Sequence, residues 1–176
     1  AILEKQIMFI QASTMSVQEV AFQDSMPEKT PDEHTLFFGQ DLSNKYVYSK
    51  FLSDREILEA AATKGLHAKI MRYGNLAARH RDGEFQINSS SNSAMGNLRA
   101  YAALKCAPFD DLTKPQEFSP IDAVAEATVK LAATPEKCRV FHVLSDHTIP
   151  LGHVLGEMRA MGHQIDFVER EAYEED

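Results

Sequence analysis

The sequence of 176 residues has few cysteines and no long apolar run, features that disulfide-rich proteins and membrane proteins need. Its two cysteines, Cys106 and Cys138, each lie in or beside an apolar run, which favours buried free thiols over a disulfide or a metal pair. No stretch approaches the ~20 apolar residues of a membrane span, and no basic segment followed by an apolar one predicts a signal peptide. We therefore expect a soluble, cytoplasmic protein with no membrane partner.

Basic residues are also scarce. The 18 Lys and Arg residues face 26 Asp and Glu residues, which gives a formal net charge of -8. Phosphate backbones and anionic membranes bind clustered Lys and Arg, and no stretch of this chain gathers them. The seven histidines lack the i, i+4 pairing of a helical metal site, and His142, His147 and His153 fit no ligand spacing. We expect neither a nucleic-acid partner nor a metal.

A hydrophobic content of 44% is enough for one real core, and apolar runs mixed with periodic stretches indicate an α/β domain. The first run, Ile7 to Ala12, is apolar except at Gln11, which is typical of a buried parallel strand. Such a strand needs neighbours on both sides. We therefore expect the chain to be part of a longer protein.

Hydroxyl residues follow this strand, in the segment Ser13 to Val17. Ligands of open α/β sheets bind at the carboxyl ends of the strands, so a hydroxyl here can face a site. Ser and Thr also cap strands and turns for structural reasons, and the sequence leaves both interpretations open. A long polar connection, residues 18 to 44, then leads to the next element.

A helix is predicted from Lys45 to Lys64, with Gly65 as its C-cap. Tyr46 and Lys50 are four residues apart and therefore share one helix face, with the ammonium beside the phenol. A neighbouring cation stabilises a phenolate, so Tyr46 is a candidate proton donor. The alternative is an ordinary half-buried tyrosine beside a solvated lysine, because this spacing alone is a weak signal.

The rest of the chain alternates helices and strands, as doubly wound sheets do. The pattern predicts strands at Leu66 to Arg72, Arg139 to Leu144 and Gln164 to Val168, and helices at Asn92 to Cys106, Pro120 to Ala133 and Leu151 to Met161.

Four ordered motifs together carry a family resemblance. They are Ser13-Thr14-Met15-Ser16-Val17, Tyr46-Val47-Tyr48-Ser49-Lys50 with Asp54, Arg72-Tyr73-Gly74-Asn75, and Ser119-Pro120-Ile121-Asp122. In order and spacing they resemble the extended short-chain dehydrogenase/reductases. Within that superfamily the chain is most similar to the thioester reductase domains that end nonribosomal peptide synthetases, polyketide synthases and carboxylic acid reductases. The departures are Asp54, where Glu is usual, and Tyr73, where proline or a small residue is common.

The resemblance implies a partial, Rossmann-like doubly wound parallel sheet with a smaller C-terminal substrate-binding part. Residues 1–78 would form the latter half of the Rossmann core, and residues 79–176 would mix substrate-side and core elements of one partial reductase domain. The implied catalytic residues are Thr14, which binds the substrate carbonyl, Tyr46, the general acid, and Lys50, which supports Tyr46. The implied cofactor-binding residues are Tyr46, Lys50, Gly74 and Asn75, with the segment from Arg79 to Cys106 on the substrate side.

The implied reaction is NAD(P)H-dependent reduction of an acyl or peptidyl thioester to an aldehyde or alcohol within a multidomain synthetase. NADPH would be the cofactor, with NADH as an alternative. The substrate would be presented on the phosphopantetheine of an acyl or peptidyl carrier domain. Hydride attack on the carbonyl would create an oxyanion, which two fixed donors would stabilise.

One family element has no counterpart in the sequence. Family members open with a Gly-x-x-Gly-x-x-Gly turn that holds the pyrophosphate, whereas the eight glycines here are dispersed. We therefore expect these 176 residues alone to be inactive, and the unpaired edge of the first strand to favour a homodimer. The alternatives are a binding or scaffold module without redox chemistry and a sugar-nucleotide epimerase or dehydratase that shares Thr14, Tyr46 and Lys50.

Overall fold

The computed structural model describes residues 7–18, 32–135 and 137–174. The chain divides into two compact units. Unit 1 consists of Ala1–Leu76 and Ile121–Leu144, and unit 2 consists of Ala77–Pro120 and Ser145–Asp176.

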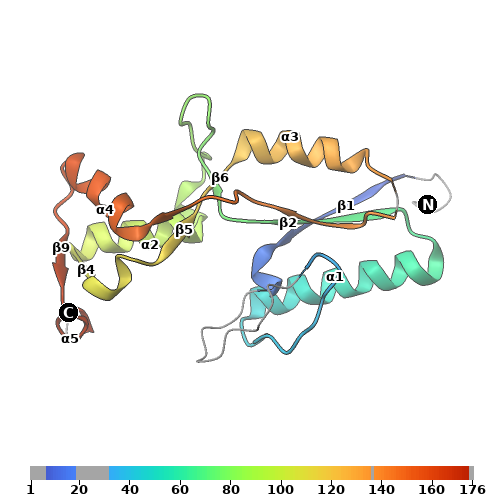
Figure 1. Cartoon of the computed structure of the whole chain (residues 1–176), viewed down its shortest axis with the longest axis horizontal. Helices are drawn as coiled ribbons and strands as arrows, with labels where there is room; N and C mark the ends of the chain where they lie inside the picture. Colours follow the sequence, from blue (N-terminus) through green and yellow to red (C-terminus); the bar gives the residue numbers. More distant parts are fainter. Residues whose placement is uncertain (1–6, 19–31, 136, 175–176) are drawn as a thin grey trace. The chain divides into compact units, whose positions relative to one another are not determined.

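Unit 1 is built on a parallel sheet of three strands, which are β1 (Phe9–Thr14), β2 (Ala68–Tyr73) and β7 (Val140–Val143), in the order β1-β2-β7. Helix α1 (Lys45–Lys64) covers one face of this sheet and α3 (Ile121–Ala132) covers the other (Figure 1). This arrangement confirms the predicted α/β class with a partial, Rossmann-like sheet. A short 3-10 helix, Met15–Gln18, follows β1 directly.

Helix α1 begins and ends where the sequence predicts. The side chain of Asn44 accepts hydrogen bonds from the backbone N–H groups of Tyr46 and Val47, which otherwise have no partner in the first turn. At the other end, Gly65 takes a left-handed conformation with φ of 66°, which costs a glycine little. Val47 and Phe51 are buried apolar residues of this helix, and the Phe51 ring packs edge-on against Phe37.

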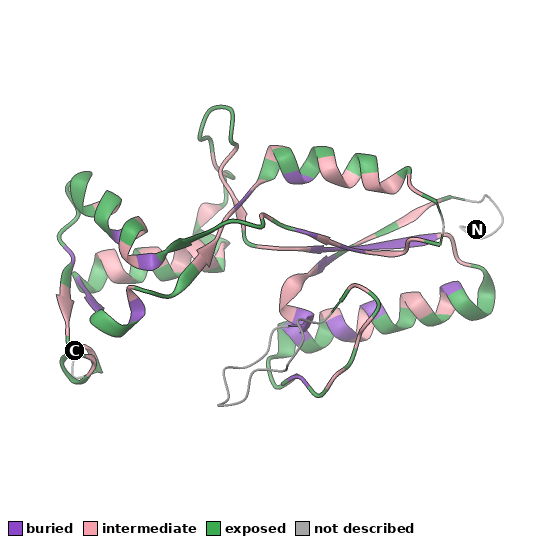
Figure 2. Ribbon diagram, viewed as in Figure 1, coloured by how far each residue is buried: buried purple, intermediate pink, exposed green. Residues whose placement is uncertain are grey.

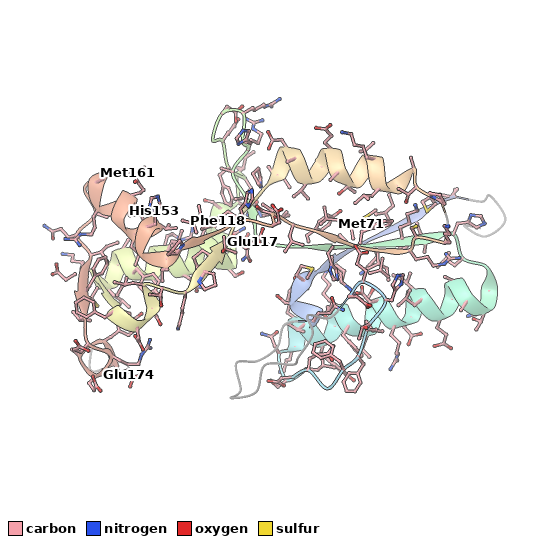
Figure 3. All side chains as sticks on the ribbon, viewed as in Figure 1. Met71, Glu117, Phe118, His153, Met161 and Glu174 are labelled. Atoms are coloured by element: carbon pink, nitrogen blue, oxygen red, sulfur yellow. The ribbon has the colours of Figure 1, made fainter. Side chains whose placement is uncertain are left out.

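The two faces of β2 have different neighbours. Met71, labelled in Figure 3, packs with Val124, Phe141 and Val143 on the α3 side. Lys69 faces the same side, where its buried ammonium donates hydrogen bonds to the carbonyls of Leu131, in the last turn of α3, and Thr134, just after it. A cation at the negative end of a helix dipole is favourable, and here it fixes α3 to the central strand. Figure 2 shows buried residues along β2 and exposed ones on the outer sides of both helices.

The first strand lies further along the chain than predicted. The sequence places it at Ile7 to Ala12, but pairing with β2 extends to the register Thr14 opposite Tyr73, so Ser13 and Thr14 belong to the strand. Ile7 and Ile10 are 50% and 41% exposed. Within the described residues β1 pairs with β2 alone, so its other edge has no strand beside it.

Unit 2 combines helices with several very short strands. The helices are α2 (Ser93–Leu104), α4 (Leu151–Ala160) and α5 (Arg170–Glu174), and the 3-10 turns are Ser89–Ser91 and Phe109–Asp111. The strands β4 (Cys106–Pro108) and β9 (Asp166–Val168) pair in parallel, and β5 (Pro115–Glu117) and β8 (Thr148–Pro150) pair antiparallel. The two-residue strands β3 (Leu76–Ala77) and β6 (Ser119–Pro120) form a further ladder.

The core of unit 2 is a cluster of Ala107, Leu151, Leu155 and Ile165. The predicted helix ending at Cys106 stops earlier, because Lys105 adopts a left-handed conformation with φ of 59° and Cys106 begins β4. Within the described part of the chain, no helix combines the length and apolar character needed to cross a membrane.

Candidate active site

Helix α1 places Tyr46 and Lys50 next to each other on adjacent turns. The Lys50 Nζ atom lies 5.9 Å from the centre of the Tyr46 ring and donates a 2.8 Å hydrogen bond to the carbonyl of Ala12 in β1. The Tyr46 side of this pair is open to solvent, with 57% of the residue exposed. A cation beside an accessible phenol is a suitable arrangement for proton transfer to a bound ligand.

Thr14 is the last residue of β1, two residues after the carbonyl that Lys50 contacts. The Thr14 hydroxyl oxygen accepts a 3.2 Å hydrogen bond from the backbone N–H of Ser16. This contact orients the hydroxyl and leaves its own hydrogen to donate. The structure therefore puts Thr14 and the Lys50 anchor at the carboxyl end of the same strand, which is where open α/β sheets bind ligands.

Gly74 and Asn75 follow β2 directly, so they leave the sheet at the same edge as Thr14. The Gly74 N–H donates a 3.3 Å hydrogen bond to the carbonyl of Val143, the last residue of β7. Tyr73, the unusual residue of this motif, makes a 3.1 Å hydrogen bond with Thr128 of α3. Its side chain thus lies on the α3 side of the sheet, opposite to the face that α1 covers.

A buried polar row lies under α1, and sequence reasoning missed it. Ser13, Arg72 and His142 are in register across β1, β2 and β7. Arg72 Nε lies 3.2 Å from the Asp54 carboxylate of α1, and both side chains are fully buried. The signal was present in the motifs, since Asp54 and Arg72 were both noted there, but nothing in the sequence pairs them.

Burial is the main influence on the pKa of Asp54 and on that of His142. Burial raises the pKa of the Asp54 carboxyl, and a contact with the Ser13 side chain, together with the hydrogen bond and charge of Arg72, opposes that rise. Burial and the positive charge of Arg72 lower the pKa of His142 below its usual range, and Glu33, which accepts a hydrogen bond from the His142 backbone N–H, opposes the shift. Several polar atoms of this row and of Asp54 make no hydrogen bond of normal geometry within the described residues: Ser13 Oγ, Asp54 Oδ1, Arg72 Nη1 and Nη2, and His142 Nε2.

Unit 2 contains a cavity of about 590 Å³. Apolar side chains of α2, α4 and the preceding loop form most of its wall, with Arg99 and His163 among the few polar groups. The lining residues are Ala77, Ala78, Phe85, Gln86, Ser89, Met95, Leu98, Arg99, Ala102, Phe118, Val154, Met158 and His163. Phe118 is labelled in Figure 3. The volume is in the range of small-molecule sites, and much of the wall comes from the segment predicted to be on the substrate side.

No three side chains of His, Cys, Asp or Glu are grouped as metal ligands in residues 7–18, 32–135 and 137–174. The candidate site therefore consists of the α1 pair, the ends of β1 and β2, and the buried row beneath them.

Comparison with known proteins identifies a matching family and several similar solved structures. Residues 1–144 match the NAD dependent epimerase/dehydratase family. A thiolation-reductase di-domain of an archaeal non-ribosomal peptide synthetase is 38% identical, with a TM-score of 0.82 over 96% of this chain and 46% of that one. The reductase domain of the aureusimine biosynthetic cluster is 29% identical, with a TM-score of 0.80 over 94% of this chain and 44% of that one.

The terminal R domain of the myxalamid PKS-NRPS pathway shares the fold at 22% identity, with a TM-score of 0.68 over 92% of this chain and 39% of that one. The chain thus spans less than half the length of each of these three structures. No curated protein sequence matches it.

Proposed function

Because the chain belongs to the NAD-dependent epimerase/dehydratase family, we propose that it supplies the catalytic residues of an NAD(P)H-dependent reductase of carrier-bound acyl or peptidyl thioesters. The observation that carries the proposal is the Tyr46–Lys50 pair on α1, anchored by Lys50 to the carboxyl end of β1. The similarity to the archaeal thiolation-reductase di-domain supports the thioester branch. The product would be an aldehyde or, after a second reduction, an alcohol.

The reduced nicotinamide cofactor would supply a hydride to the thioester carbonyl carbon. The Thr14 and Tyr46 hydroxyls would donate hydrogen bonds to the carbonyl oxygen as negative charge develops there. Tyr46 would provide the proton, and Lys50 would stabilise the phenolate that remains. When the carbonyl reforms, the carbon–sulfur bond would break, the hydroxyl proton of the intermediate would pass to the departing carrier thiolate, and a proton from solvent would restore Tyr46.

The nicotinamide end of a cofactor fits the residues at this sheet edge. One hydrogen of the Lys50 ammonium is directed at the Ala12 carbonyl, and the others can reach ribose hydroxyls. Gly74, which has no side chain, and Asn75 follow β2 at the same edge, so the backbone there permits a close approach. NADPH is the cofactor we propose, with NADH as the alternative.

The cavity of unit 2 is the proposed place for the apolar part of the substrate. Its wall is mostly apolar, so a fatty acyl chain or an apolar amino-acid side chain would lose little by leaving water there. The thiolation domain joined to the reductase in the archaeal structure supports a carrier domain as partner and phosphopantetheine as the tether. We place such a synthetase in the cytoplasm.

An epimerase or dehydratase of sugar nucleotides is the second candidate, because the family name includes these activities. UDP-glucose 4-epimerase from Thermus thermophilus shares the fold at 17% identity, less than half of the identity to the archaeal reductase. This difference favours the reductase.

The test is an assay of the full-length protein with NADPH and octanoyl-CoA, in parallel with UDP-glucose and NAD. We expect NADPH oxidation together with octanal or octanol, identified by mass spectrometry, and no conversion of the sugar nucleotide. Epimerised sugar with no aldehyde or alcohol would establish the second candidate. The absence of turnover and of NADPH binding would favour a binding module without redox chemistry.

A further inference from the structure

One face of α1 passes from solvent into the core over three turns. Tyr46, Lys50 and Asp54 are four residues apart in succession, so they line up along this face. Tyr46 is 57% exposed, Lys50 is half-buried, and Asp54 is completely buried. The helix face that carries the proposed acid Tyr46 and its supporting cation Lys50 thus ends at Asp54, which substrate cannot reach.

Asp54 joins α1 to the central strand. Its carboxylate lies 3.2 Å from Arg72 Nε in β2, while Lys50, one turn earlier, contacts the Ala12 carbonyl in β1. A third polar contact comes from Gln11 of β1, which donates a 2.9 Å hydrogen bond to Ser53. Contacts to two adjacent strands fix both the rotation of the helix about its axis and its position along the sheet.

A gain in folding stability does not by itself explain why Asp54 and Arg72 form a buried ion pair. Taking both charges out of water is costly, and replacing such a pair by apolar residues of similar volume is often neutral or stabilising. Apolar contacts are also non-directional, so they tolerate many placements of a helix on a sheet. A buried ion pair keeps its geometry only when the helix has one particular rotation and position. Val47 and Phe51 already bury the helix, so what the pair adds is a defined position.

We propose that Asp54 and Arg72 are positioning residues for Tyr46 and Lys50, an inference that rests on the proposed function. The pair holds α1 so that the Lys50 ammonium meets the Ala12 carbonyl and stays beside the Tyr46 ring. Without the pair, α1 shifts or rotates on its apolar contacts. A displacement of about 1 Å in a catalytic group can cost on the order of a hundredfold in rate.

The test in the full-length protein uses the double variant Asp54→Leu/Arg72→Met, which removes both charges and leaves no buried ion unpaired. We expect it to fold with a thermal midpoint near that of wild type, and to reduce octanoyl-CoA with a kcat/KM lower by roughly tenfold to a hundredfold. Asp54→Asn retains the size of the side chain and is the second variant, with an expected loss in the same direction.

Two further variants separate position from charge. Asp54→Glu keeps the carboxylate, so it should retain most of the rate. Glu59→Gln removes an exposed carboxylate of the same helix and should leave the rate unchanged. A double variant with wild-type kcat/KM would overturn the proposal, because the pair would then be structural only.

A second readout does not depend on activity. Brief labelling with acetic anhydride, followed by mass spectrometry, reports how well each lysine is protected. We expect Lys50 labelling to rise several-fold in the double variant and in Asp54→Asn, while Lys45, exposed at the start of α1, labels equally in all proteins.

Unchanged Lys50 labelling in both variants would show that the pair does not hold this side chain and would overturn the inference. If wild-type protein reduces no thioester but Lys50 labelling still rises in the variants, the proposed function fails and the positioning of Lys50 stands.

Discussion

The Lys50 ammonium lies 5.9 Å from the centre of the Tyr46 ring and is held there by the carbonyl of Ala12. A helix therefore carries both the phenol and the cation, while a neighbouring strand supplies the anchor. The site depends on how α1 is seated on β1 as much as on the two side chains.

Replacing Tyr46 by Phe removes the acidic hydroxyl and little else. Turnover should fall by roughly a hundredfold or more, the usual loss when general acid catalysis is removed, with cofactor binding little changed. Steady-state kinetics and calorimetric titration with NADPH measure the two effects. Tyr48→Phe is the matched control, because Tyr48 is an exposed tyrosine of the same helix. Wild-type turnover in Tyr46→Phe would mean that Tyr46 is not the acid.

Replacing Lys50 by Ala removes the cation and the contact with Ala12. We expect a loss of turnover and a weaker affinity for NADPH, since this ammonium is proposed to serve both the phenol and the ribose. Lys45→Ala, at the exposed start of α1, is the control and should change neither quantity. A Lys50→Ala enzyme with unaltered kcat and NADPH affinity would refute the assignment.

Filling the unit 2 cavity should change which acyl chains are accepted. Ala102 lines the cavity from α2, whereas its neighbour Ala103 is exposed and does not. Ala102→Phe should raise KM for octanoyl-CoA by roughly tenfold more than KM for acetyl-CoA. The loss of one or two methylene contacts in an apolar pocket weakens binding by about that factor. Ala103→Phe should have no such effect. An equal change for both substrates would argue against the cavity as the acyl site.

His142 should make the protein less stable as the pH falls. Its folded pKa is lowered, so protons bind more readily to the unfolded chain, where histidine titrates near pH ~6.5. The penalty is absent well above that pH and grows as the pH falls below it, until the folded pKa is passed. Urea unfolding between about pH 7.5 and 5.5 should show this decline, and His142→Gln should lessen it. His147→Gln, at a histidine whose side chain is 90% exposed, is the control substitution.

The 176 residues on their own should bind NADPH too weakly to measure, because no glycine-rich turn is present to hold the pyrophosphate. They should also self-associate through the edge of β1, where Ile7 and Ile10 are exposed. Calorimetry and sedimentation on one sample examine both expectations. Micromolar binding by a clean monomer would contradict them.

Long elements of unit 1 were predictable from local sequence. Helix α1 has the predicted bounds because Asn44 and Gly65 are local signals for its two ends. The pairing of the Lys50 ammonium with the Tyr46 phenol was also predictable, since residues four apart share one face of any helix. The family resemblance read from the motifs agrees with the matched family and with the similar reductase structures.

Other features depend on contacts that no local pattern encodes. Strands of three residues, such as β4 and β5, are too short to show a periodicity, and β4 exists because β9 pairs with it. The Asp54–Arg72 pair joins two residues of different elements, and a strand pattern does not predict a fully buried arginine at its centre. The predicted bounds of β1 were wrong because they followed the apolar residues. Pairing with β2 sets the bounds of the strand instead.

The anchor of Lys50 is a backbone carbonyl, and every amino acid has one. Substitution at position 12 therefore leaves the acceptor in place, which makes this contact tolerant of evolutionary drift. It will also leave no trace of co-variation between positions 12 and 50 in related sequences. Selection can act on the contact only through residues that hold the strand and the helix together. The evolutionary record of this constraint should therefore be sought at those residues and not at positions 12 and 50.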